Sequence, residues 1–183
     1  MHVYPLTPDL AKARALADGH GQVAVLYTCD VPLCREGAQM VKSELAAIGL
    51  GVHIKTFPFP IFFAKLAAPG EPFDLAWAGY TADYPDPQGL LDPILEISAL
   101  VPTFDDPAYQ RKLAAAARLT GPKRYLAYGN LDLDLTRNAA PLAAIGNLLS
   151  YDFFSARIGC QTYSYWYGMD LGALCLRGGA HHT

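Results

Sequence analysis

The stretch from Phe73 to Pro87, FDLAWAGYTADYPDP, joins a nearly continuous apolar run to a polar segment rich in proline. Its apolar part, residues 73–79, predicts a central strand, because a strand that is covered on both faces carries apolar residues in succession. The polar part contains two carboxylates, Asp83 and Asp86, and begins where this strand ends. What these carboxylates can do depends on the elements that precede the strand.

Two further strands are expected upstream of this stretch. Residues 22–27 (QVAVLY) form an apolar run that predicts a buried strand. In residues 52–57 (VHIKTF), apolar Val52 and Ile54 alternate with polar residues, which predicts a strand with one exposed face. Helices are expected before and between the strands: one with Thr7 as its N-cap, one that begins at Pro32, and one over residues 61–66.

Parallel strands joined by helices form an open α/β sheet, so the first 80 residues predict half of such a sheet. Ligands of these sheets bind beyond the carboxyl ends of the strands, and Asp83 follows the third strand at that edge. The rest of the chain is predicted as two helices followed by short strands. The helices begin at Asp106-Pro107 and Gly121-Pro122, with apolar stripes of Tyr109, Leu113 and Ala116 and of Tyr128, Leu131 and Leu135; strands are expected at 141–145, 153–160 and 174–176, an aromatic cluster at 163–167, and disorder from 178.

Composition excludes several classes of protein. The 183 residues are 52% hydrophobic and 17% charged, so the chain can bury a core and is not disordered. The net charge of −3 provides no basic surface, and we expect no nucleic-acid partner. The low share of charge predicts an apolar surface that faces a partner. Residues 1–5 do not resemble a signal peptide, so either the protein is cytosolic or the chain is a fragment whose leader lies upstream.

The four cysteines, Cys29, Cys34, Cys160 and Cys175, fit no zinc or redox spacing. Two interpretations stay open: disulfides between the sequence-adjacent pairs, or buried free thiols. The strand-to-helix turn between Cys29 and Cys34 is short enough to bring their Cα atoms within about 7 Å, the limit for a disulfide.

Asp83 and Asp86 are the candidate chemical groups. Two carboxylates in one turn can bind a metal or act as an acid and base, which leaves a small α/β enzyme as an alternative function. Aspartate before proline is also ordinary turn chemistry, and this is the interpretation we favour for Asp86. Asp83 lies among Tyr80, Thr81 and Tyr84, where a carboxylate can bind a cationic ligand group. No nucleophile motif, nucleotide motif or metal-ligand spacing is present, so neither a metal nor another cofactor is expected.

Four segments together resemble a known family. They are residues 8–13 (PDLAKA), 41–52 (VKSELAAIGLGV), 73–76 (FDLA) and 78–87 (AGYTADYPDP). In this order they resemble the C-terminal lobe of the family 5 extracellular solute-binding proteins, which serve peptide, nickel and related ABC importers. The resemblance covers roughly residues 4 to 145.

The resemblance implies an α/β fold of the type II periplasmic-binding-protein kind, an open and mostly parallel sheet with flanking helices. Residues 1–140 would form the lobe, and residues 141–183 would return toward an N-terminal lobe that this chain lacks. It further implies a fragment of a periplasmic or extracellular binding protein, associated with the membrane through its transporter. Its expected partners are a peptide or another small solute, the membrane subunits of an ABC importer, and the missing lobe.

In peptide-binding members of the family, an aspartate at the position that matches Asp83 holds the α-amino group of the ligand. The positions that match Trp77, Gly79, Tyr80 and Thr81 lie beside it, although Tyr80 stands where the family often has tryptophan. The resemblance therefore implies a binding module without catalysis, most simply for peptides. Two alternatives remain: the small enzyme that uses Asp83 and Asp86, and an interaction domain that keeps the fold without transport. An upstream coding sequence with a signal peptide and another lobe would exclude the latter.

Overall fold

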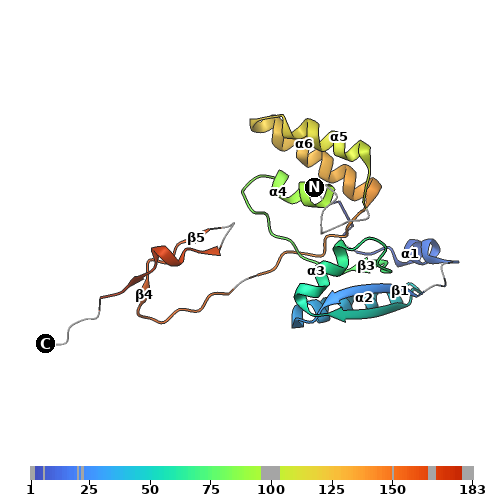
Figure 1. Ribbon diagram of the computed structural model, residues 1–183, viewed down its shortest axis with the longest axis horizontal. Coiled ribbons are helices and arrows are strands. Elements are labelled where there is room, and N and C mark those ends of the chain that lie inside the picture. The colour runs from blue at the N-terminus through green and yellow to red at the C-terminus, as the bar shows by residue number, and fades with distance from the viewer. Residues whose placement is uncertain are drawn as a thin grey trace.

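The structure is a computed structural model that describes residues 3–5, 7–19, 21, 23–95, 104–149, 151–164 and 168–178. Figure 1 shows an α/β part, a helical hairpin, and a C-terminal arm that extends away from both along the longest axis. No helix within the described ranges is long and apolar enough to cross a bilayer. The class is mixed α/β with a parallel three-stranded sheet, as the sequence predicts.

The sheet consists of β1 (Ala24–Cys29), β2 (Val52–Phe57) and β3 (Leu75–Ala76), in the order β2-β1-β3. The prediction for β2 is confirmed residue by residue, whereas β1 begins two residues later than expected. The prediction of a long central strand at 73–79 is wrong, because β1 holds the centre and β3 has two residues. The chain leaves the sheet directly after Trp77, whose N–H still donates to the carbonyl of Tyr27 at 3.0 Å.

Two helices cover opposite faces of β1, because successive strand residues point to opposite sides. Tyr27 and Cys29 pack with α3 (Phe59–Ala67), through Phe62 and Leu66. Leu26 packs with α2 (Pro32–Ala46), through Ala38. This two-sided burial explains the continuous apolar run of β1.

The first helix, α1 (Leu10–Ala17), begins later than expected. Its N-cap is Asp9 and not Thr7: the Asp9 carboxylate accepts from the Lys12 N–H at 2.9 Å. Aspartate at this position satisfies a free helix N–H and also favours the positive end of the helix dipole.

The helical hairpin consists of α5 (Pro107–Ala117) and α6 (Gly121–Asp134), followed by a π-helical turn over Leu135–Ala139. Asp106 caps α5 as predicted, since its carboxylate accepts from the Ala108 N–H at 2.8 Å. The sequence placed no element at α4 (Gln88–Leu95), which adds Leu91 to the core of the hairpin. Both predicted stripes are buried in this core: Tyr109, Leu113 and Ala116 of α5, and Tyr128, Leu131 and Leu135.

The C-terminal arm has little regular structure in its described residues, 141–149, 151–164 and 168–178. The predicted strand at 141–145 is wrong, and the one at 153–160 reduces to β4 (Ile158–Gly159). A strand requires a partner, and β4 finds one in β7 (Cys175–Leu176), as expected near 174–176. The remaining elements are β5 (Tyr163–Ser164), β6 (Gly168–Met169) and a 3-10 turn at Leu171–Ala173, while residues 165–167 of the predicted aromatic cluster and 179–183 of the predicted disordered tail lie outside the described residues.

Both sequence-adjacent cysteine pairs form disulfides, which settles the alternative left open above. Cys29 and Cys34 have Cα atoms 5.4 Å apart, at the turn from β1 into α2. Cys160 and Cys175 have Cα atoms 5.3 Å apart and join β4 to β7. The prediction that Cys29 and Cys34 can be bridged is confirmed.

Candidate ligand-binding site

The candidate site is the loop from Trp77 to Pro87, which connects β3 to α4. It begins at the carboxyl edge of the sheet, next to the end of β1. In open α/β sheets this edge is where ligands bind. The loop is anchored at three places: at Trp77, at Ala82 and at Asp86.

The first anchor is the indole ring of Trp77, which packs against the backbone of α2. A methyl group placed at Gly37 would lie 2.2 Å from Trp77 Cε2, far inside van der Waals contact. The absence of a side chain at Gly37 is therefore what admits the ring. Trp77 also packs on the cluster of Leu26, Ala38 and Val52, so this predicted site residue has a packing role of its own.

The second anchor is Ala82, which is buried although its neighbours in the loop are exposed. A Cβ at Gly89, in the first turn of α4, would lie 3.5 Å from Ala82 Cβ and 3.4 Å from the Tyr84 carbonyl oxygen. The loop thus folds back onto the start of α4. Gly79 and Thr81, both predicted to line the site, are exposed.

Asp83 is exposed, and the hydroxyl of Tyr80 donates to its Oδ2 at 3.3 Å. No backbone N–H of the described residues donates to this carboxylate, so most of its acceptor positions are open to solvent. Burial raises the pKa of Tyr80, and the charge and hydrogen bond of Asp83 raise it further. Tyr80 therefore remains a donor at neutral pH. The structure joins these two predicted site residues directly.

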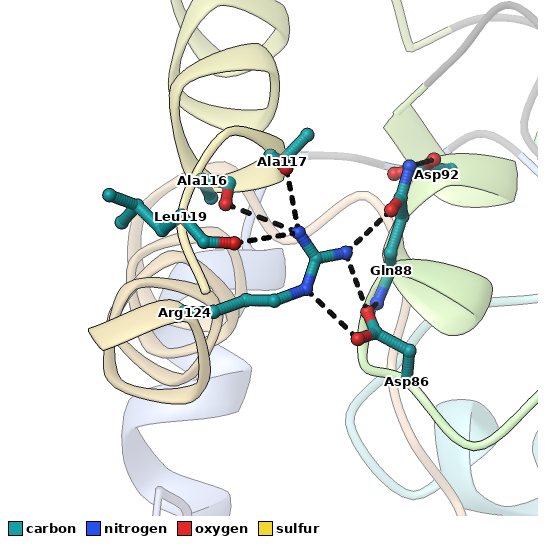
Figure 2. Close-up of polar contacts among 7 residues, drawn as sticks. All are labelled: Asp86, Gln88, Asp92, Ala116, Ala117, Leu119 and Arg124. Atoms are coloured by element: carbon teal, nitrogen blue, oxygen red, sulfur yellow. Dashed lines mark hydrogen bonds and ion pairs between the residues drawn. The ribbon is translucent and has the colours of Figure 1, made fainter. Parts of the chain in front are cut away.

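The third anchor is Asp86, whose carboxylate is occupied by Arg124 of α6 (Figure 2). Arg124 donates from Nε to Oδ2 at 2.9 Å and from Nη2 to Oδ1 at 2.8 Å. The N–H of Gln88, the first residue of α4, donates to the same Oδ1 at 2.9 Å. Hydrogen bonding from Arg124 is the main reason that the pKa of Asp86 lies below its ordinary value.

Arg124 and Gln88 are not among the site residues expected from the sequence. A signal for Arg124 was present: it lies four residues before Tyr128 and so extends the buried stripe of α6 by one turn. A charged residue on a buried stripe requires a partner of opposite charge. Nothing in the sequence identifies Asp86 as that partner.

Asp92 of α4 lies in the same neighbourhood as Asp86. Burial raises the pKa of Asp92, and Gln88 Nε2 donates to its Oδ2 at 2.6 Å. Asp92 Oδ1 and the Tyr128 hydroxyl are buried and have no hydrogen-bond partner among the described residues. Among the residues that the structure describes, no group of three histidine, cysteine, aspartate or glutamate side chains is placed to hold a metal ion.

The sequence matches no protein-family model and no curated protein. Solved structures with the same fold include substrate-binding proteins of ABC transporters, and several are bound to peptides or described as dipeptide, oligopeptide or tripeptide proteins. The ABC transporter substrate-binding protein CtaP from Listeria monocytogenes matches 92% of this chain with a TM-score of 0.71 and 20% identity. A dipeptide-binding protein from Pseudoalteromonas sp. SM9913 in complex with Met-Leu matches 91%, with a TM-score of 0.69 and 19% identity.

The periplasmic binding protein DppA from Helicobacter pylori, in complex with the peptide STSA, matches 76% of the chain with a TM-score of 0.59 and 22% identity. The chain covers 36%, 35% and 30% of these three proteins, about a third of their length. Identities this low establish the shared fold: a periplasmic-binding-protein-like domain.

Proposed function

We propose that this chain is one lobe of the substrate-binding protein of an ABC importer, and that Asp83 binds the N-terminal ammonium group of a peptide. The observation that carries the proposal is the open carboxylate of Asp83 at the carboxyl edge of the parallel sheet. Its neighbour Asp86 is fully paired, which leaves Asp83 as the carboxylate of this loop that is free to take a cation. Exposed rings of Tyr80 and Tyr84 stand beside it and offer faces for a ligand.

An ammonium group paired with Asp83 would form charge-assisted hydrogen bonds, which contribute about 1.5–3 kcal/mol each when water is excluded. Asp83 is exposed in this chain, so the lobe alone provides little such exclusion. Two-lobed binding proteins exclude water by closing around the ligand. We therefore expect weak binding by this chain and tight binding when a second lobe covers the site.

The proposed partners are that second lobe and the membrane subunits of the importer. Support comes from the chain's length, about a third of that of the binding proteins that share its fold. Its two disulfides suit an oxidising compartment, which agrees with a periplasmic or extracellular location.

The test is an NMR titration of the 15N-labelled chain with trialanine and with N-acetyl-trialanine. We expect trialanine to shift the amides of the 77–88 loop with a dissociation constant weaker than micromolar, and N-acetyl-trialanine to bind at least about tenfold more weakly. Asp83→Asn should abolish most of this difference. Equal losses for both peptides on Asp83→Asn would show that Asp83 shapes the turn and does not bind the amine, and sub-micromolar affinity would contradict the need for a second lobe.

The enzyme alternative gains no support from the site. An acid and base pair needs both carboxylates available for proton transfer, with pKa values near the working pH. Asp86 is held by Arg124, which lowers its pKa away from that range. The alternative of a non-transport interaction domain predicts that trialanine leaves the 77–88 loop unshifted, so the same titration separates it from the proposal.

A further inference from the structure

We propose that Arg124 is a positioning residue for the ligand site: from the helical hairpin, it fixes the loop that carries Asp83. The expected effect of Arg124 on peptide binding rests on the proposed function, whereas its fixation of the loop rests on the contacts shown in Figure 2. Arg124 lies 38 residues after Asp86 in the sequence, on helix α6 of the hairpin and outside the sheet.

The guanidinium group of Arg124 is engaged on all sides. Its Nη1 donates to the carbonyl oxygen of Ala117 at 2.8 Å, with longer contacts to those of Leu119 at 3.4 Å and Ala116 at 3.5 Å. The carbonyls of Ala116 and Ala117 end α5, and that of Ala116 already accepts from the Leu119 N–H, so the cation chiefly provides a donor for Ala117 at the negative end of that helix dipole. The remaining donors face the loop, and the head group therefore ties the end of α5 to the Asp83 loop.

On the loop side, Arg124 contacts Asp86 of the loop and Gln88, the first residue of α4. Besides the two bonds to Asp86, its Nη2 donates to Gln88 Oε1 at 2.6 Å. Gln88 in turn donates to Asp92, so the contact continues along α4. The Tyr128 ring lies under the guanidinium, with Arg124 Cζ 4.9 Å from its centroid. Tyr128 is almost completely buried, so its ring provides a fixed face against which the guanidinium group packs.

Asp83 and Asp86 are separated by Tyr84 and Pro85, so an immobile Asp86 leaves the Asp83 backbone little freedom. Ala82, on the other side of Asp83, is held against Gly89 of α4. Asp83 is thus the exposed middle of a segment that is fixed at both ends. Such fixation lowers the entropic cost of binding an ammonium group, because the carboxylate is already placed.

A lysine cannot replace this arginine, because its single ammonium lacks the planar fork that reaches Asp86, Gln88 and the carbonyls of α5 at once. The test therefore compares Arg124→Gln, Arg124→Lys and the double variant Asp86→Asn/Arg124→Gln. The matched control is Lys112→Gln, which removes the other ion pair of the hairpin, between Lys112 and Asp134, without touching the loop. Circular dichroism establishes that each variant is folded at the temperature of measurement.

Two readouts are measured on each variant: amide hydrogen exchange of residues 80–89, and the ratio of the affinities for trialanine and N-acetyl-trialanine. We expect faster exchange in this segment and a ratio about tenfold lower for Arg124→Gln, with Arg124→Lys in between and Lys112→Gln like wild type. The double variant should resemble Arg124→Gln. If it instead regains the wild-type ratio, Arg124 acts only by neutralising Asp86, and the proposal is overturned.

Failure of the proposed function is distinguishable from failure of this inference. If wild type binds neither peptide, the function is wrong, and hydrogen exchange alone decides whether Arg124 fixes the loop. If wild type binds trialanine selectively and Arg124→Lys leaves both exchange and ratio unchanged, the function stands and the role of Arg124 is refuted. Arg124→Lys retains the charge and the aliphatic stem, so it provides this answer even if Arg124→Gln does not fold.

Discussion

The indole ring of Trp77 occupies the space that a side chain at Gly37 would fill: a Cβ there would lie within 2.2–2.6 Å of three ring atoms. This contact joins the exit of β3 to the middle of α2. It sets where the chain leaves the sheet and enters the loop that carries Asp83. Helix α2 therefore takes part in positioning the candidate site through a residue that has no side chain.

Gly37→Ala should destabilise the chain, even though alanine is the better helix former. Propensity favours alanine by about 1 kcal/mol, whereas forcing a rigid ring and a helix backbone apart costs about 1–3 kcal/mol. Urea unfolding should therefore give a lower midpoint for Gly37→Ala. The control is Gly129→Ala on α6, where nothing lies within 4 Å of the added Cβ; it should stabilise by about 0.5–1 kcal/mol. A stabilised Gly37→Ala would contradict the packing described.

Two ion pairs of the hairpin should differ in their importance for stability. The side chains of Arg124 and Asp86 are 14% and 23% exposed, whereas those of Lys112 and Asp134 are 52% and 31% exposed. Exposed pairs contribute little, and a shielded pair that loses one partner leaves a charge uncompensated. We expect Asp86→Asn to lower the thermal midpoint by several degrees and Lys112→Gln to leave it nearly unchanged. If calorimetry gave the same loss of thermal midpoint for both variants, the greater importance of the Arg124–Asp86 pair would be refuted.

The contribution of Asp86 should depend on pH in a defined direction. Its pKa in the folded chain lies below the ordinary value of 3.8, chiefly because Arg124 donates hydrogen bonds to the carboxylate. The stabilisation is therefore complete above the unfolded-state value and is lost as the pH falls through the lowered folded-state value. The difference in stability between wild type and Asp86→Asn should be constant from pH 5 to 7 and shrink below about pH 4. A stability difference between wild type and Asp86→Asn that grows as the pH falls would contradict a lowered pKa of Asp86.

The two disulfides should differ in what they stabilise. Cys29 lies in β1 and is fully buried against α3. Replacing Cys29 and Cys34 by alanine should therefore destabilise the whole sheet by about 2 kcal/mol. Replacing Cys160 and Cys175 should loosen β4 and β7 without changing the midpoint of the sheet. Hydrogen exchange resolved by residue separates these outcomes. Loss of protection in β1 after the second replacement would contradict the independence of the two regions.

The C-terminal arm should make the chain self-associate. Leu148, Leu149 and Phe153 are 75%, 80% and 93% exposed, and none of the three lies in a helix or strand. Apolar side chains gathered in one exposed segment favour association. Light scattering should therefore give a mass above the monomer at high concentration, and replacing these three residues with serine should restore the monomer. Leu126→Ser on α6 is the control, since it removes a single exposed leucine and should not change the mass.

Elements stabilised by neighbouring residues were predictable. Asp106 and the stripe of Tyr109 and Leu113 predicted α5, because caps and the helical period act within a few residues. The same reasoning was wrong for β3, whose apolar run reflects packing on α2 and not a central place in the sheet. It was wrong again at 141–145, because none of the described strands pairs with these apolar residues. Burial and pairing are decided by partners distant in sequence.

The division at residue 140 stays a prediction; the structure ends the π-helical turn there, with Ala140 in the left-handed conformation. The sequence by itself determined the order of strands and helices and the place of Asp83 after the third strand, since local periodicity identifies these elements, and strands joined by crossover helices are parallel. Only the tertiary structure decided that Arg124 occupies Asp86 while Asp83 stays open. The two carboxylates stand in similar local sequence, and the cation that distinguishes them reaches the loop only after the hairpin has folded against it.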